Sequence, residues 1–376
     1  MAKGIYLGID SLSRKVKKMY LGIEGVARKV KKGYVGVNGL ARLFFSGGGK
    51  PSFLGRFEPI FDHHNYAAVA GTKDYLLISG GADYDVNPYD VVSVFNDDYT
   101  EESQLQIPNG SQNQIGATFK ERAYFIGGST RKINQNGATN SVYCFSGDLT
   151  LIDFSLPYSV KEAGIATTKT KCILAGGENA SGDDLRNVSA FDEDQTTIQA
   201  SSGLRLPITL PAGAGTEDNA IFIGGIWNSL AQTDRTAYDN NLTKTQLDSS
   251  ISLYGRLSGC KTGRYALFGG GSDRRDETDR VEAYDNELSI IVLSPLDQAR
   301  YNTVAFNIGE FGLFAGGSSV NSTVNAVDCY DGNLEKTVVP TEFSAATPEK
   351  LNWRGGASEN IGAIYGESVM YGWKLI

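Results

Sequence analysis

The sequence predicts an all-β fold built from repeated four-stranded units. An apolar run that ends in two glycines recurs six times, with first glycines 47, 49, 48, 45 and 47 residues apart. A near-constant interval of this size indicates a repeat architecture. Each run is four or five residues long between turn-forming residues, which favours a strand over a helix. The pairs are Gly80-Gly81, Gly127-Gly128, Gly176-Gly177, Gly224-Gly225, Gly269-Gly270 and Gly316-Gly317.

Each unit contains four short segments of strand character. In the first unit, small apolar residues at 66–70 precede a polar turn at 71–74, and the run at 75–78 leads to the glycines. A Val-x-x-aromatic pattern follows, as at 92–95 and 281–284, and several of the aromatic residues precede an aspartate. A weaker alternating segment, such as 288–293, closes the unit.

A four-stranded unit of this kind cannot bury both of its faces alone. Radial stacking of the units around an axis buries them, and closure of the ring leaves only short edges, so the pattern predicts a β-propeller. The glycine pairs suit positions where the backbone adopts positive φ or approaches a neighbouring strand closely. Phosphate binding is disfavoured, because no Gly-Lys-Ser/Thr signature or helix-forming segment follows any pair.

The end of the chain indicates seven blades, with six as the alternative. Residues 361–366 resemble the glycine-pair strand with one glycine lost, and Val369-Met370-Tyr371 stands at the place of the third strand. No fourth strand remains after Ile376. We therefore expect a segment near the start of the propeller, at 57–61, to complete the last blade.

These six double glycines, with an aromatic residue 13 to 17 positions after each pair, make the chain resemble the Kelch-repeat propeller family. The resemblance covers residues 53–376. Many Kelch units carry a tryptophan near the final strand, where this chain has leucines such as Leu105, Leu247 and Leu293. The resemblance implies a scaffold that binds other molecules through its loops.

Residues 5–46 contain a second repeat, with a period of 14 residues. Each unit places an apolar five-residue run before a turn pair such as Asn38-Gly39, a strong hairpin signal. The pattern predicts six short strands in a β-meander. Aromatic and basic residues recur at matching positions and are the candidate attachment residues: Tyr6, Tyr20, Tyr34, Arg14, Arg28 and Arg42.

This N-terminal block differs in charge from the remainder of the chain. It holds ten basic and two acidic residues, a balance of +8, while the remainder holds 25 basic and 41 acidic residues, a balance of −16. Such asymmetry indicates a basic interaction arm on an acidic body. A partner-facing pair of strands is favoured over nucleic-acid binding, because no aromatic stacking platform or groove-reading helix accompanies the charge.

The Tyr-x-Gly and Ala-Arg-Lys-Val-Lys-Lys pattern of this block resembles a short repeat at the start of virion proteins from phages and prophages of Gram-positive hosts. The resemblance implies a virion component that is made in the host cytoplasm, is present in several copies and attaches to other virion proteins. The expected domains are an attachment module at 1–46, a Gly/Ser/Pro linker at 47–53 and a propeller at 54–376.

The composition argues against several other functions. The four cysteines fall at strand positions in different repeats and indicate small core residues in a reducing compartment. The two histidines, His63 and His64, are adjacent and would point to opposite faces of a strand, so no metal site, cofactor or oxidase chemistry is expected. No apolar run of 18 residues indicates membrane insertion, no secretory signal is expected, and no Gly-x-Ser-x-Gly elbow suggests a hydrolase. We expect no catalytic residues.

Binding residues are expected in the loops that follow the glycine pairs, because equivalent loops of a propeller emerge on one face and variable loops on a rigid scaffold carry binding. Trp227 is the sharpest candidate, since an indole can stack on a sugar or anchor a protein interface. An alternating acidic stretch at 83–87 is interpreted as a solvated turn and not as a calcium loop. The candidate binding residues are Asp83, Tyr84, Arg131, Lys132, Asp183, Asp184, Trp227, Asn228, Asp273, Arg274, Arg275 and Asn321.

Three functions compete at this point. The first is a non-enzymatic component of a phage or phage-tail-like particle, anchored by the arm, whose propeller binds a glycan or protein of the host surface or another virion protein. The second is an intracellular protein-interaction adaptor, and the third is a carbohydrate-active enzyme. The basic arm separates the first from the second, because an adaptor has no evident need of it.

Overall fold

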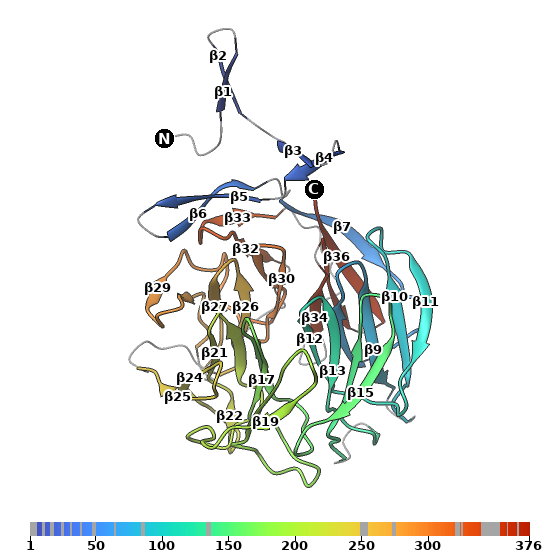
Figure 1. The fold of residues 1–376 in the computed structure, drawn as a ribbon. Helices are drawn as coiled ribbons and strands as arrows, with labels where there is room; N and C mark the ends of the chain where they lie inside the picture. Colours follow the sequence, from blue (N-terminus) through green and yellow to red (C-terminus); the bar gives the residue numbers. More distant parts are fainter. Residues whose placement is uncertain are drawn as a thin grey trace. The chain divides into compact units, whose positions relative to one another are not determined.

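The computed structural model confirms an all-β, seven-bladed propeller (Figure 1). It describes residues 50–376 except 64, 84–86, 133–136, 249–254, 273–275, 320–323, 325, 340–353, 359 and 367. Among the first 49 residues it describes the backbone of six strands. The part of the chain so described contains no helix, and hence no helix that is long and apolar enough to cross a membrane.

The first three blades follow the chain from its first strand to its fourth. They are β8 to β11 (Asn65–Gly71, Leu76–Ala82, Val91–Phe95, Glu101–Gln106), β12 to β15 (Ile115–Phe119, Arg122–Ile126, Ser141–Phe145, Leu151–Ser155) and β16 to β19 (Gly164–Thr167, Cys172–Ala175, Val188–Phe191, Thr197–Gln199). Within each blade, all neighbouring strands are antiparallel.

The next three blades repeat this order. They are β20, β21, β24 and β25 (Ala212–Gly215, Asn219–Ile223, Arg235–Asp239, Lys244–Gln246), β26 to β29 (Ser258–Thr262, Tyr265–Gly269, Val281–Tyr284, Ile290–Val292) and β30 to β33 (Val304–Ile308, Phe311–Ala315, Val327–Tyr330, Lys336–Val338). The fourth blade carries an additional hairpin, β22 and β23 (Ile226–Trp227, Leu230–Ala231), between its second and third strands.

The seventh blade joins the two ends of the propeller. Its strands are β34, β35 and β36 (Arg354–Ala357, Ile361–Gly366, Val369–Leu375), followed by β7 (Pro51–Phe57) from the start of the chain. Figure 1 shows β7 beside β36. Closure by an N-terminal strand was therefore predicted correctly, but the strand is Pro51–Phe57 and not 57–61. Because Pro51, Ser52 and Phe53 belong to this strand, the predicted linker at 47–53 is also wrong in its last three residues.

The hydrophobic core lies between the blades. Each cluster of buried side chains draws on two adjacent sheets, so that Tyr124 of the second blade contacts Phe191 of the third with ring centroids 5.0 Å apart. The same arrangement joins the last blade to the first, where Tyr365 and Met370 pack with Ile78 and Phe95. The first strands of adjacent blades contact one another in a closed ring, in which β34 meets β8.

The aspartate that follows several of the aromatic residues shapes the turn between the third and fourth strands. Asp285 accepts hydrogen bonds from the backbone N–H groups of Glu287 and Ser289, at 3.1 and 2.8 Å. Leu288 lies between these two residues with a φ of 63°. In this way the aspartate side chain accepts hydrogen bonds from backbone N–H groups of the turn, which have no partner in a neighbouring strand.

The N-terminal block forms three separate two-stranded sheets and not one meander. They are β1 with β2 (Tyr6–Ile9, Leu12–Lys15), β3 with β4 (Met19–Ile23, Val26–Val30) and β5 with β6 (Lys32–Val37, Leu40–Ser46). The register repeats with the sequence, since Leu7 faces Arg14, Leu21 faces Arg28 and Val35 faces Arg42. The contacts within the chain divide it into two compact units. Residues 1–51 and 375–376 form one unit, and residues 52–374 form the other.

Candidate binding face

The glycine pairs lie at one end of the propeller, which we call the diglycine face. In five of the six pairs both glycines have positive φ, for example 69° at Gly176 and 96° at Gly177. A Cβ on Gly176 would lie 2.3 Å from the carbonyl oxygen of Ile208, in the segment that leads into the next blade. The N–H of Gly177 donates a 2.8 Å hydrogen bond to that same oxygen. The glycine pair therefore packs against the segment that leads into the next blade. Its positive φ and this close approach both require glycine, so the pair has a structural role.

The fifth pair differs by one residue from the sequence prediction. Gly269 ends strand β27, while Gly270 and Gly271 have the positive φ values, 70° and 116°. The N–H of Gly271 donates to the carbonyl oxygen of Arg300, just as Gly81, Gly128 and Gly177 donate to a carbonyl oxygen that precedes the next blade. Because three glycines follow one another here, the sequence does not show which two of them form the pair. The structure shows that the pair is Gly270 and Gly271.

The candidate loops all connect a second strand to a third strand. Because the first strands form the central ring and every sheet is antiparallel, these loops emerge together at the diglycine face. Described candidates from three adjacent blades lie there: Arg131 and Lys132, then Asp183 and Asp184, then Trp227 and Asn228. Asp83 lies in the equivalent loop of the first blade. Tyr84, Asp273, Arg274, Arg275 and Asn321 fall outside the described residues.

The loop of the third blade is partly fixed by its own side chains. The Asn179 amide donates to the Asp183 carboxylate at 3.1 Å, and the Asn179 oxygen accepts the N–H of Asp183 at 2.9 Å. Partial burial raises the pKa of Asp184, and the neighbouring Glu178 and Asp183 carboxylates add to the rise. Lys161 forms a 2.8 Å ion pair with Glu178 at the base of this loop. Asp183 thus has a structural role, and the loop presents negative charge.

The loop of the fourth blade is the additional hairpin β22–β23. Trp227 pairs with Leu230 across the turn, and Asn228 and Ser229 between them have φ values of 48° and 60°. Two consecutive positive φ values characterise a type I′ turn, which matches the twist of a two-stranded ribbon. Leu230 is 51% exposed and Trp227 is half-buried. The hairpin thus presents an apolar tip beside the charged loops.

The central channel opens at the same face through a cavity of about 270 Å³. Six residues share a positive φ, and each lies at or just before the start of the first strand of its blade: Tyr66, Asn113, Glu162, Leu210, Arg256 and Asn302. The last five line the cavity. Their backbones bridge neighbouring blades, since Leu210 N–H donates to Glu162 and Asn302 N–H donates to Arg256, both at 2.9 Å. The cavity therefore has a rim of two amides, one carboxylate and one guanidinium.

Sequence reasoning missed this rim, although a signal for it exists. Each rim residue lies 14 positions before the first positive-φ glycine of its own blade, as with 113 and 127 or 256 and 270. The constant spacing would have aligned the six positions. The residue types differ, because left-handed backbone and not a particular side chain is what the position shares.

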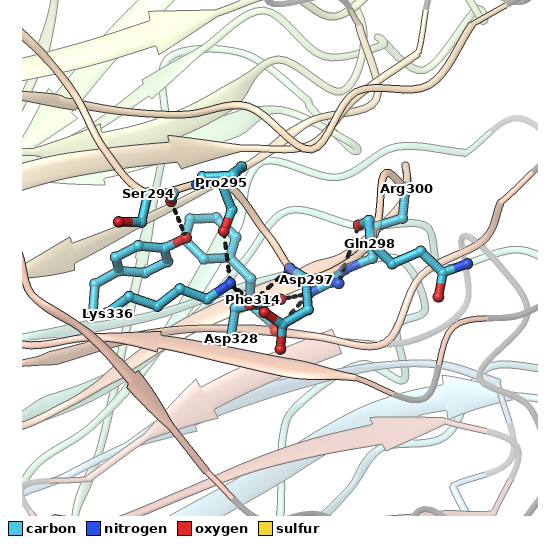
Figure 2. A network of polar contacts seen from close by, with 9 residues as sticks. Ser294, Pro295, Asp297, Gln298, Arg300, Phe314, Asp328 and Lys336 are labelled. Atoms are coloured by element: carbon cyan, nitrogen blue, oxygen red, sulfur yellow. Dashed lines mark hydrogen bonds and ion pairs between the residues drawn. The ribbon is translucent and has the colours of Figure 1, made fainter.

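Two other polar groups are structural. His63 is fully buried, with Nδ1 2.7 Å from the carbonyl of Gly80 and Nε2 3.0 Å from the hydroxyl of Ser93. Figure 2 shows a network in the sixth blade, where the buried Arg300 and Asp328 pair at 2.5 Å and Lys336 lies 2.6 Å from Asp328. Partial burial lowers the pKa of Lys336, but its hydrogen bonds to Asp297 and Asp328 raise it overall. His64 lies outside the described residues, and those described contain no cluster of His, Cys, Asp and Glu suited to a metal.

Comparison with known proteins supports the fold. A solved structure titled "Structure of YjhT" superposes with a TM-score of 0.55 at 14% sequence identity, covering 76% of this chain and 99% of that chain. At this identity the likeness shows the propeller fold alone. No protein-family model and no curated protein matches the sequence.

Proposed function

We propose that the chain is a binding protein in which the diglycine face of the propeller recognises a target. The proposal rests on one observation: the scaffold repeats regularly from blade to blade, whereas the side chains of the loops differ from blade to blade. The rim and the glycine pairs keep a constant spacing, while the loops between them present basic, acidic and apolar residues in adjacent blades. Variable side chains on a rigid frame are how propellers and similar scaffolds bind. A propeller fold is compatible with this role.

We further propose that the N-terminal arm attaches the propeller to a larger particle. Its three hairpins repeat one register, with an arginine opposite the residue that follows each tyrosine. Two-stranded hairpins are marginally stable alone and gain order on a partner surface. Arginine and tyrosine are the residue types that dominate interface energies. The resemblance of residues 5–46 to virion proteins makes a phage or phage-tail-like particle the proposed assembly.

Transfer of the arm to another protein tests the attachment. Residues 1–50 fused to an unrelated soluble domain should co-purify with particles. A matched fusion with Arg14, Arg28 and Arg42 changed to serine should be lost from them. If the wild-type arm fusion stays off the particles while residues 51–376 associate, the attachment lies in the propeller and this part of the proposal is wrong.

Substitution of the apolar hairpin tip tests the recognition face. Particles that carry Trp227→Ala together with Leu230→Ser should adsorb less to host cells than wild-type particles. The control is Ile198→Ser, because Ile198 is a comparably exposed apolar residue (41%) on the outer strand β19. If wild-type particles, the double variant and the Ile198→Ser variant adsorb equally, the hairpin is not part of the recognition surface.

A further inference from the structure

The second mouth of the central channel holds a cavity of about 420 Å³. It opens at the end opposite the diglycine face, where the first strands turn into the second strands, and we call this end the hairpin face. The two cavities share a waist formed by one small or aliphatic residue from each first strand: Val69, Gly116, Ile165, Gly213, Gly259, Ala305 and Gly355. Two positions further along the strands, the lining becomes polar.

Lys261 of strand β26 lies in this polar layer and is half-buried. Within the part of the chain that the structure describes, its ammonium group makes no hydrogen bond and no ion pair. Burial lowers the pKa of Lys261, and the negative charge of Glu217 opposes this effect. An ammonium group that has lost part of its hydration without a partner is unfavourable in the folded chain. A partner from solution would relieve this cost.

The cavity beside Lys261 has room for such a partner, and neighbouring positions supply hydrogen-bonding groups. Gly215, in the same layer on the adjacent first strand, packs closely against that strand's neighbour, since a Cβ there would lie 2.0 Å from the carbonyl oxygen of Thr167. The Thr167 hydroxyl on β16 and the Asn307 amide on β30 also line the cavity. Among the described residues, neither side chain has a hydrogen-bond partner. By contrast, the hydroxyl of Thr118 is committed, because it donates to Ala357 and accepts from Gly71.

We propose that the hairpin-face mouth binds a small oxyanion, a carboxylate or phosphate on a compact hydroxylated molecule. Lys261 pairs with the anionic group, while Thr167 and Asn307 hydrogen-bond to its oxygens or to hydroxyls beside it. A lysine acts as a point charge and suits either oxyanion. Of the two exposed charged residues that also line the cavity, Lys73 adds attraction for an anion and Glu121 opposes it, so Lys261 supplies the charge on which the proposal depends. This site lies at the opposite end of the propeller from the proposed recognition face and is independent of it.

Calorimetric titration of the full chain with three matched sugars tests the site. Glucuronate supplies a carboxylate, glucose 6-phosphate supplies a phosphate, and glucose is the neutral control. At least one of the two anions should bind and glucose should not. Lys261→Met should weaken binding about tenfold or more, since a charge-assisted contact is lost. Lys120→Met is the control and should bind as the wild type does, because Lys120 is exposed and does not line the cavity.

Chemical labelling of the wild-type chain gives a second readout that does not depend on a variant's folding. Lys261 should be acetylated by acetic anhydride in the free protein and protected by the anion that binds, while Lys73 and the other exposed lysines remain reactive. The proposal is wrong if neither anion binds, if Lys261→Met binds like the wild type, or if binding leaves the labelling of Lys261 unchanged.

Discussion

The hydroxyl group of Tyr99 donates a hydrogen bond to the carbonyl oxygen of Trp373, 2.7 Å away, and thereby joins the first blade to the last. The carbonyl of Gly362 lies 2.8 Å from the same hydroxyl. Phe57 of the closing strand stacks on the Tyr99 ring at 4.6 Å. Burial raises the pKa of Tyr99, so the hydroxyl stays protonated. One side chain thus contacts both strands that meet where the ring closes.

Loss of this hydroxyl should destabilise the ring. Tyr99→Phe keeps the stacked ring but leaves two buried carbonyls without their donor, which costs about 1–3 kcal/mol. Tyr75→Phe is the control, because no described residue pairs with its half-buried hydroxyl. Denaturant unfolding measures both variants, and equal midpoints would show that the contact contributes nothing.

Removal of strand β7 should have a larger effect than removal of the arm. A chain that starts at residue 51 keeps the closing strand, whereas one that starts at residue 58 exposes the edge of β36 and loses the contacts of Phe53 with Tyr371 and Trp373. The first truncation should melt close to the full chain and the second far below it. Matching melting temperatures would contradict closure by β7.

Substitution within a glycine pair should show that the pairs hold the blades together. Gly176→Ala places a Cβ against the Ile208 carbonyl in a left-handed backbone, and we expect it to destabilise the fold by about 2 kcal/mol or more. Gly147→Ala is the matched control, because a Cβ at this position would have no neighbouring atom within 4 Å and the φ of Gly147 is not positive. Chemical denaturation of the two variants should separate them clearly.

Buried tyrosines should make the fold sensitive to alkali. Burial raises the pKa of Tyr158 to about 12, from 10.0, and also raises the pKa of Tyr124 and Tyr238. Above pH 10 the unfolded chain releases these protons while the folded chain retains them, so stability is complete below pH 10 and falls as the pH rises toward 12. Phenolate absorbance and circular dichroism should therefore change together. Ionisation of these residues before unfolding would contradict their burial.

The repeated scaffold could be predicted from the sequence because its requirements are local. A glycine pair that needs positive φ, a short apolar strand and an Asp-closed turn each leave a signature within a few residues. The closing strand was misplaced because Pro51 follows a glycine-rich stretch, although proline is tolerated as the first residue of a strand. The arm's strands were found, but nothing local distinguishes separate hairpins from one meander.

The candidate site was only partly predictable. The loops at the diglycine face follow directly from the position of the glycine pairs, and Trp227 stood out within them. The rim residues Asn113, Glu162 and Arg256 did not stand out in the sequence, because they share a backbone conformation and not a residue type. Lys261 was missed for a related reason: on an alternating strand, only the closed ring shows which side chains line the channel.

Hydrogen exchange of the chain in intact particles, compared with the purified chain, tests the central claim most directly. If the arm attaches the propeller and the diglycine face remains available, residues 1–46 should become strongly protected in the particle. The loops at 129–132, 179–184 and 226–231 should exchange as they do in the purified protein. Protection of these loops with an unprotected arm, or absence of the chain from the particles, would contradict the account.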